Sequence, residues 1–276
     1  MIIRFTKMEG LGNDFVVIDG INQPISLSRE QIRHIADRHF GIGCDQLLLV
    51  DTATDSSVLF NYRIFNADGG EVEQCGNGAR CFARFVHEKG LTQERHIPVQ
   101  TKAGKLILEL QDDGQVTVNM GIPGFQPAQI PFEAAEAAGH YALDLDQETI
   151  NIGAVALGNP HAVLQVDNVN TTPVEILGPQ IEGHQRFPQR VNAGFMEIVD
   201  QNMIKLRVYE RGVGETLACG SGACAAVAVG RQWQLLSENV QVQLTGGTLT
   251  VSWQGEGQPL MMTGPATTVF EGSLEL

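Results

Sequence analysis

The sequence has few positive charges and no long apolar run. Its 18 lysine and arginine residues face 32 aspartate and glutamate residues, which gives a formal net charge of −14 at pH 7. A surface this acidic repels phosphate backbones and anionic lipids, so we expect neither a nucleic-acid nor a membrane partner. The longest apolar runs, such as Leu47–Val50 and Ala223–Val229, fall far short of the roughly 20 residues that a bilayer-spanning helix needs. The first ten residues also lack the apolar core of a signal peptide.

Cysteine and lysine are scarce as well. The five cysteines are an odd number and too few for a disulfide scaffold in 276 residues, so we expect a cytoplasmic protein with reduced thiols. No cysteine pair has CxxC spacing and no histidine lies at ligand spacing, which argues against a metal site. None of the five lysines lies in the repeated motif described below, so that motif offers no Schiff-base residue for pyridoxal phosphate. We expect no cofactor.

An internal duplication is the most informative feature that is present. Residues 63–79, RIFNADGGEVEQCGNGA, align without a gap with residues 207–223, RVYERGVGETLACGSGA, and seven of the 17 pairs are identical. The offset is 144, and a match at offset 143 continues into residues 104–121 and 247–264. Two related halves are therefore predicted. They would meet near residues 120–125, where the sequence is typical of a linker.

Capping signals predict a helix in the first half. Ser28 precedes a stretch with helical spacing of apolar residues, and Gln31 completes a capping box. Ile32, Ile35 and Phe40 would then share one buried face. The pattern predicts a helix from Ser28 to about Phe40.

Strand signals dominate the rest of each half. Alternating apolar and polar residues at 105–110 and 115–120 flank a turn sequence, and residues 248–253 repeat the pattern in the second half. A helical run follows each repeated cysteine, at 79–89 and 223–232. Each half is therefore predicted to be a mostly antiparallel or mixed sheet with one principal helix, which is an α+β fold.

The duplicated element has a strand, a loop and then Cys-Gly-x-Gly-Ala opening a helix. Cys75 and Cys219 occupy the equivalent position in the two copies. The unpaired amides and the positive dipole end of a helix N-terminus favour the thiolate form of a cysteine. The glycines allow backbone N–H groups to approach an anion closely. Each half would thus offer one activated thiol beside a site for a small anion.

Two such thiols on opposite sides of a carboxylate suit one reaction well. Inverting a stereocentre next to a carboxylate requires a base on one face and an acid on the other. The helix N-termini would stabilise the charge that develops on the carboxylate as the proton leaves, without a cofactor. The other three cysteines, Cys44, Cys81 and Cys224, lack this context, and we interpret them as core residues.

Four motifs strengthen this interpretation. They are NADGGEVEQCGNGARC (66–81), ERGVGETLACGSGACAA (210–226), KMEGLGNDFVVID (7–19) and GNPHAV (158–163). In this order they resemble the diaminopimelate epimerases over essentially the whole chain. The resemblance implies a cofactor-independent isomerase that interconverts LL- and meso-diaminopimelate in lysine and peptidoglycan biosynthesis. Cys75 and Cys219 would be its two catalytic residues.

The resemblance also implies an architecture. It consists of two pseudo-symmetric domains, each a sheet wrapped around a central helix. We place the first domain at residues 1–121 with a C-terminal strand at 265–276, and the second at 122–264. The active site would lie in the cleft between them.

The family's substrate-binding residues are carried over one at a time. The reacting α-carboxylate would be held by the backbone amides of Gly76, Asn77, Gly220 and Ser221. Asn13 and Gln46 would line the reacting end. The distal amino-acid end would be held by Asn66, Asn159, Asn192 and Arg211. Glu210 would bind the substrate amine, and His161 and Glu210 would tune the thiol pKa values.

A C-terminal strand forms part of the homodimer contact in relatives, often with a tyrosine. Phe270 stands at that position here, so we expect an aromatic packing contact in a homodimer, without the hydroxyl.

Two alternatives stay open on the sequence alone. A proline or hydroxyproline racemase would share the opposed thiols but would lack the asparagine set and Arg211. A binding or redox protein would use Cys75 and Cys219 as a reversible disulfide pair.

Overall fold

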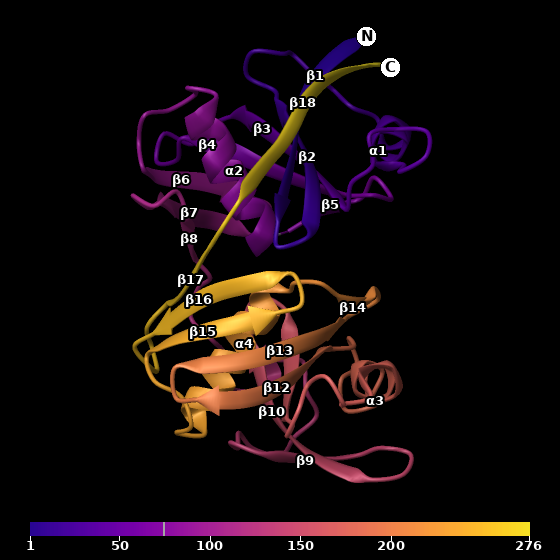
Figure 1. Cartoon of the computed structure of the whole chain (residues 1–276), viewed down its shortest axis with the longest axis vertical. Helices are drawn as coiled ribbons and strands as arrows, with labels where there is room; N and C mark the ends of the chain where they lie inside the picture. Colours follow the sequence, from indigo (N-terminus) through magenta and orange to yellow (C-terminus); the bar gives the residue numbers. More distant parts are fainter. Residues whose placement is uncertain (74) are drawn as a thin grey trace. The chain divides into compact units, whose positions relative to one another are not determined.

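The computed structural model describes residues 1–73 and 75–276. The chain divides into two compact units (Figure 1). The first comprises Met1–Asn119 and Thr263–Leu276, and the second comprises Met120–Met262. The boundaries expected from the sequence lie two residues away from these. The α+β prediction is confirmed, with strands in the majority and one long helix packed inside each unit.

The first unit is a mixed sheet around helix α2. Its elements, in chain order, are β1 (Ile2–Gly10), β2 (Asn13–Asp19), α1 (Arg29–Ala36), β3 (Gln46–Thr52), β4 (Phe60–Asn66), β5 (Glu71–Val72), α2 (Gly76–Glu88), β6 (His96–Thr101), β7 (Gly104–Leu110), β8 (Val116–Asn119) and β18 (Thr267–Glu275). Strand β1 pairs antiparallel with both β2 and β18, and β2 continues parallel into β3. In Figure 1 the yellow β18 lies alongside the indigo β1.

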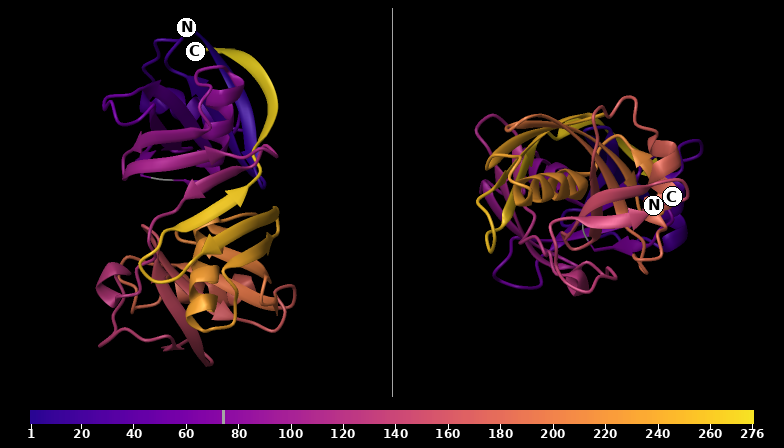
Figure 2. Two further views of the ribbon diagram at one scale, coloured as in Figure 1. Left: turned by 90° about the vertical axis from the view of Figure 1, so that its left-hand side faces the viewer. Right: turned by 90° about the horizontal axis from the view of Figure 1, so that it is seen from below.

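The second unit repeats this plan around helix α4. Its elements are a short 3-10 helix (Pro127–Gln129), β9 (Tyr141–Asp144), β10 (Thr149–Ala156), β11 (Pro160–Gln165), α3 (Val174–Glu182), β12 (Asn192–Asp200), β13 (Met203–Glu210), β14 (Gly214–Thr216), α4 (Gly220–Gln232), β15 (Asn239–Leu244) and β16 (Gly247–Trp253), followed by β17 (Leu260–Gly264). Strands β11 and β12 run parallel, as β2 and β3 do in the first unit. Seen from below, α4 lies inside its curved sheet (Figure 2).

Both central helices are buried on nearly every side. In α2 the buried side chains include Phe82, Phe85 and Val86, and α4 is built almost entirely of small residues from Ala223 to Val229. Helix α4 is apolar on nearly all sides, as a core helix should be, whereas α2 also buries the charged Arg80. Complete burial of a phenylalanine side chain such as Phe82 contributes about 1.5–3 kcal/mol. This packing fixes the position of each helix N-terminus within its own unit.

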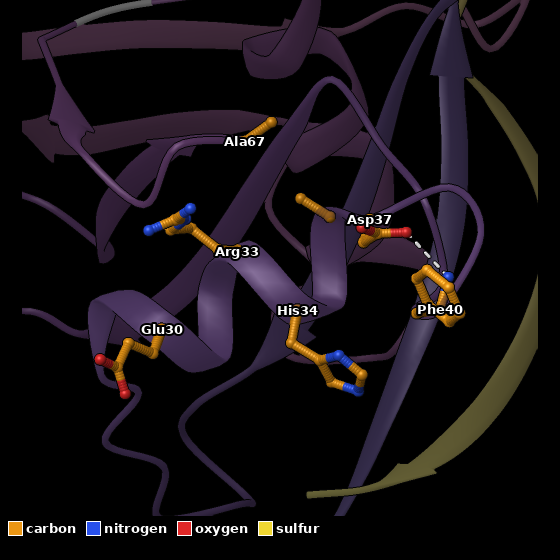
Figure 3. A pocket seen from close by; sticks show the side chains of 7 residues that line it. Glu30, Arg33, His34, Asp37, Phe40 and Ala67 are labelled. Carbon is orange, nitrogen blue, oxygen red and sulfur yellow. Dashed lines mark hydrogen bonds between the residues drawn. The ribbon is translucent and has the colours of Figure 1, made fainter.

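Helix α1 begins as predicted and ends early. Ser28 is its N-cap, and both hydrogen bonds of the capping box with Gln31 are present. The helix stops at Ala36, because the Asp37 carboxylate accepts the backbone N–H groups of His39 and Phe40 at 2.7 and 2.8 Å and turns the chain. Figure 3 shows the bond to Phe40 as a dashed line. Phe40 is 82% exposed, so the prediction that it lies on the buried face is wrong.

Among the described residues, no helix combines the length and the apolar character that crossing a membrane requires.

Candidate active site

The two repeated cysteines occupy the same structural position in their respective units. Cys75 is the N-cap of α2 and Cys219 is the N-cap of α4, each with extended backbone dihedrals. Gly76 and Gly220 are the first residues of these helices. The first amides of a helix have no partner within the helix and point toward its N-terminus. Each unit therefore places a thiol beside backbone donors that suit a carboxylate.

The second glycine of each Cys-Gly-x-Gly-Ala motif is required for packing. A Cβ atom on Gly78 would lie 2.5 Å from the Tyr62 hydroxyl oxygen, and one on Gly222 would lie 2.9 Å from a Val208 methyl carbon. Real Cβ contacts are essentially never that short. These two glycines thus let each helix start lie directly against its sheet, in addition to the role in anion approach that the sequence suggested.

The Cys75 thiol lies among backbone and amide groups of the first unit. Its Sγ accepts the Gly78 N–H at 3.3 Å and lies 3.9 Å from Asn13 Oδ1. Asn77 Nδ2 donates to the same Asn13 oxygen at 3.3 Å. The structure therefore brings together three of the predicted site residues: Asn13, Cys75 and Asn77.

Gln46 and Asn66 lie at the same edge of that sheet. They are direct partners in the β3–β4 register, and Gln46 Nε2 donates to Asn66 Oδ1 at 2.9 Å. Gln46 Oε1 is buried and has no hydrogen-bond partner among the described residues. A buried acceptor without a partner is costly. This oxygen is therefore available for a donor on a bound molecule.

In the second unit, a chain of polar contacts leads to Cys219. His161 Nε2 lies 2.9 Å from Asn159 Oδ1, Asn159 Nδ2 donates to Ser221 Oγ at 3.4 Å, and Ser221 Oγ lies 3.7 Å from Cys219 Sγ. His161 is 1% exposed and faces Asn192 in the parallel β11–β12 register. The residues predicted from the GNPHAV and ACGSGA motifs are thus neighbours in space.

Asn192, Glu210 and Arg211 complete this group. Asn192 Oδ1 accepts the Arg211 backbone N–H at 3.0 Å, and its Nδ2 donates to the Pro160 carbonyl at 3.0 Å. The Thr216 hydroxyl donates to Glu210 Oε1 at 2.5 Å. The Arg211 side chain is exposed and donates to the Gln189 carbonyl at 3.2 Å. Its guanidinium retains further donors for an anion.

The electrostatic setting of Cys219 differs from the expectation of an activated thiol. Burial raises the pKa of this thiol well above its usual value, and the negative charge of Glu210 raises it further. The Gly222 N–H and the Ser221 hydroxyl oppose the shift without reversing it. Desolvation thus outweighs the helix N-terminus, and the thiol form is favoured here.

The remaining cysteines behave as core residues. Burial raises the pKa of Cys44 to about 11 and that of Cys81 still further. Cys224 is also fully buried.

The protonation of His161 carries a pH prediction. Burial, with a smaller contribution from the nearby Arg211 charge, lowers the pKa of His161 from 6.5 to about 3. Between these pH values the unfolded chain binds a proton that the folded chain does not, so the folded state loses stability as the pH falls. We expect His161→Gln to remove this loss, which reaches at most about 1.4 kcal/mol per pH unit.

Urea unfolding of both proteins between about pH 7 and about pH 4 measures the effect. The difference in free energy of unfolding should move in favour of the variant as the pH falls. His34→Gln, at an exposed position of α1, is the control and should follow the wild-type profile. If the free energies of unfolding of wild type and His161→Gln changed with pH in parallel, the lowered pKa of His161 would be contradicted.

Sequence reasoning missed two charged residues beside Cys75. Asp45 accepts the side-chain N–H of Asn13 at 2.8 Å, and Arg80 donates to Asn77 Oδ1 at 3.0 Å. Arg80 is completely buried, which is rare for arginine. Its place directly after the repeated segment CGNGA, in the first turns of the helix, was the signal that the sequence offered.

A hollow of about 470 Å³ lies elsewhere on the first unit, along α1 and the loop that follows it (Figure 3). Its lining comprises Glu30, Arg33, His34, Ala36, Asp37, Phe40 and Ala67. None of these is a predicted site residue. Across residues 1–73 and 75–276, no group of three or more His, Cys, Asp or Glu side chains could hold a metal ion.

Comparison with known proteins assigns the chain to a family. The sequence profile of the family described as diaminopimelate epimerase matches residues 5–125 and 153–269. The chain belongs to the diaminopimelate epimerase family. A diaminopimelate epimerase from Thioalkalivibrio sulfidiphilus is 62% identical over 278 residues and covers 100% of both chains. One from Nitrosospira multiformis is 57% identical, covering 100% of this chain and 99% of its own.

The fold extends beyond this epimerase family. The crystal structure of a hydroxyproline epimerase from Agrobacterium vitis, with bound trans-4-hydroxy-L-proline, matches with a TM-score of 0.70 at 18% identity. The match covers 99% of this chain and 92% of that one. At this identity the likeness shows a shared fold and does not extend to substrate.

Proposed function

We propose that the chain interconverts LL- and meso-diaminopimelate by inverting one α-carbon, an isomerisation in the biosynthesis of lysine and of peptidoglycan. The observation that carries this proposal is that each unit places a cysteine at the N-cap of its central helix. The identity of 62% over the full length of a diaminopimelate epimerase supports the choice of substrate.

The proposed mechanism uses Cys75 and Cys219 as the two acid–base groups. One thiolate removes the α-proton, and the pair of electrons from the C–H bond delocalises into the carboxylate. The other thiol then delivers its proton to the opposite face of the same carbon, so the two cysteines exchange protonation states. The reverse direction uses the same steps in the opposite order.

The helix N-termini supply the electrostatic stabilisation that this reaction needs. The α-proton of an amino acid is a very weak acid, so the charge that develops on the carboxylate must be stabilised as it forms. The amides of Gly76, Asn77, Gly220 and Ser221 begin α2 and α4, and we propose that they hold this carboxylate. This arrangement performs the reaction without a cofactor.

Glu210 gives the mechanism a way to generate a thiolate. Its negative charge contributes to raising the pKa of Cys219. We propose that the substrate ammonium pairs with Glu210 and neutralises this repulsion. The pKa of Cys219 then falls when substrate is bound, so that its thiolate can form. His161, neutral because burial lowers its pKa to about 3, would act on Cys219 through Asn159 and Ser221.

In this proposal, different amide side chains bind the two ends of the substrate. Asn13 and Gln46 line the reacting end, where Gln46 Oε1, which has no hydrogen-bond partner among residues 1–73 and 75–276, accepts a substrate N–H. The distal amino-acid end is held by Asn66, Asn159, Asn192 and Arg211. Arginine suits a carboxylate because its planar fork can donate two parallel hydrogen bonds.

We also propose that the chain works as a homodimer in the cytoplasm. Phe270 on β18 is 48% exposed and packs edge-on against Phe5 at 6.0 Å between ring centroids. Its neighbour Val269 is 55% exposed. These side chains provide an apolar surface for a second copy. The cytoplasm keeps thiols reduced, which the proposed chemistry requires.

The proposed function predicts the outcome of an exchange assay. The reduced protein, incubated with LL-diaminopimelate in D₂O, should yield meso-diaminopimelate with deuterium at the inverted α-carbon. Proline and hydroxyproline under the same conditions should remain unlabelled. Chiral chromatography with mass spectrometry measures both results.

The other outcomes identify the alternatives. Label in proline but not in diaminopimelate would indicate a proline racemase and overturn the proposal. Exchange into neither substrate, together with reversible formation of a Cys75–Cys219 disulfide, would indicate a redox or binding protein.

A further inference from the structure

The side-chain amide of Asn13 is held in one orientation by a carboxylate. Asn13 Nδ2 donates to Asp45 Oδ2 at 2.8 Å. An ionised carboxylate can only accept hydrogen bonds, so the NH₂ group must face Asp45. The amide oxygen is thereby turned the other way, toward Asn77 Nδ2 at 3.3 Å and Cys75 Sγ at 3.9 Å.

The guanidinium of Arg80 fixes the orientation of Asn77, the residue that donates to the Asn13 oxygen. Arg80 Nη1 donates to Asn77 Oδ1 at 3.0 Å, and an arginine can only donate. The Asn77 NH₂ group must therefore point away from Arg80 and toward Asn13. Arg80 itself is anchored by its Nε–H on the Pro265 carbonyl at 2.9 Å. Hydrogen bonds thus run in one direction, from Arg80 through Asn77 and Asn13 to Asp45.

Asp45 is held in place by the charged residues around it. Its Oδ1 pairs with Arg38 Nη2 at 2.8 Å, and its Oδ2 also accepts the Asp14 N–H at 3.1 Å. Arg38 binds Asp14 as well, through two bonds of 2.9 and 2.7 Å. Partial burial opposes ionisation of Asp14, but hydrogen bonds from Arg38 and Lys7 outweigh it, and the pKa of Asp14 lies well below its usual range. The Asp45 carboxylate is thus held by an ion pair with Arg38 and a hydrogen bond from the Asp14 N–H.

The second unit holds its corresponding asparagine the other way round. Asn159 Oδ1 faces His161 Nε2, and its NH₂ group faces Ser221, which contacts Cys219. A donor end is therefore directed toward the Cys219 side, whereas an acceptor end is directed toward Cys75. The orientation of this asparagine is thus one feature in which the duplicated sites differ.

We propose that Asp45 is a positioning residue that holds the Asn13 amide oxygen toward Cys75, so that this thiol meets an acceptor rather than a donor. An acceptor interacts favourably with S–H and unfavourably with the thiolate. The orientation of Asn13 therefore favours the protonated form of Cys75, the form that delivers a proton. This inference rests on the proposed function, in which Cys75 is one of the two acid–base thiols.

The test is the pH dependence of Cys75 alkylation in the absence of substrate. Iodoacetamide modification of Cys75 is followed by peptide mass spectrometry in a Cys219→Ala background, with and without Asp45→Asn. Once Asp45 is neutral, among the described residues only the 3.3 Å hydrogen bond from Asn77 Nδ2 still holds the Asn13 oxygen, so the Asn13 amide can turn its NH₂ group to the sulfur and stabilise the thiolate. The midpoint of alkylation should then move to lower pH by about one unit.

Loss of the Asp45 charge alone would act in the same direction, so a second pair of variants separates the two effects. In an Asn13→Ala background, Asp45→Asn should shift the midpoint by much less if Asp45 acts through Asn13. An equal shift in both backgrounds would overturn the proposal, because it would show direct electrostatic action on the thiol. No shift in either background would overturn it too.

Two further features keep the test decisive. The Asp45 side chain is 46% exposed, so we expect its variants to fold, and Asp45→Ala is a second variant with the same expected shift. Circular dichroism confirms the fold of each protein. Because alkylation is measured without substrate, its failure rejects the positioning role, whereas failure of the D₂O assay rejects the proposed function.

Discussion

Replacing either Cys75 or Cys219 with alanine should reduce epimerisation of diaminopimelate by about 10²- to 10⁴-fold while leaving the fold intact. Each variant lacks one of the two groups that must act on opposite faces of the α-carbon, so neither direction of the reaction can be completed. Both cysteines lie at helix N-caps, where alanine removes one capping hydrogen bond at Cys75 and no side-chain capping hydrogen bond at Cys219, so we expect both helices to form. Turnover is measured by chiral chromatography and the fold by circular dichroism.

The helices themselves provide matched controls. Cys81 in α2 and Cys224 in α4 are fully buried within one or two turns of the proposed catalytic cysteines. Alanine at either position removes a sulfur from the same helix and should preserve most of the activity. Near-normal turnover in Cys75→Ala or Cys219→Ala would reject the two-base mechanism, even if the family assignment stands.

Arg211→Met should weaken binding of diaminopimelate, by about 2–5 kcal/mol if the bound substrate covers this exposed side chain and the pair with the distal carboxylate is buried. Lysine, which has one carboxylate fewer, makes the test specific. It should bind weakly to the wild type and equally weakly to Arg211→Met. Competition binding measures how much Arg211→Met changes the affinity for diaminopimelate and how much it changes the affinity for lysine.

An exposed arginine of the first unit serves as the control for net charge. Arg29→Met removes one positive charge at a side chain that is 67% exposed and should leave both affinities unchanged. If Arg211→Met weakens lysine as much as diaminopimelate, the residue does not recognise the distal carboxylate. Unchanged affinity for diaminopimelate would have the same meaning.

The local features of this chain could be predicted because each depends on residues close together in the sequence. The capping box at Ser28 and the helices that begin after Cys75 and Cys219 depend on residues within a few positions of each other. The early end of α1 could not be predicted from apolar spacing. There the Asp37 side chain takes up the backbone N–H groups of the next turn, which apolar periodicity does not reveal.

The charged residues around Cys75 were missed for a different reason. Asp45 reaches Asn13 across 32 positions of sequence, and Arg80 is anchored on Pro265 across 185. Such contacts follow from strand order, which a single sequence does not specify. The raised pKa of Cys219 is likewise a consequence of tertiary burial. A motif shows that a cysteine begins a helix, but the energy of desolvation depends on what covers it.

Strand β18 has a consequence for how the protein is made. It pairs with β1 from Ile2–Glu275 through Glu9–Thr267, yet the ribosome synthesises it only after the whole of the second unit. During translation β2 can pair with residues 6–10 of β1, while the other edge of β1 and the core residues Ile3 and Phe5 have no strand partner until β18 is made. The second unit is contiguous and can fold while the nascent chain emerges. The first unit, although it emerges earlier, should therefore be the last to mature, and an aborted chain that stops short of β18 would expose an open strand edge to aggregation.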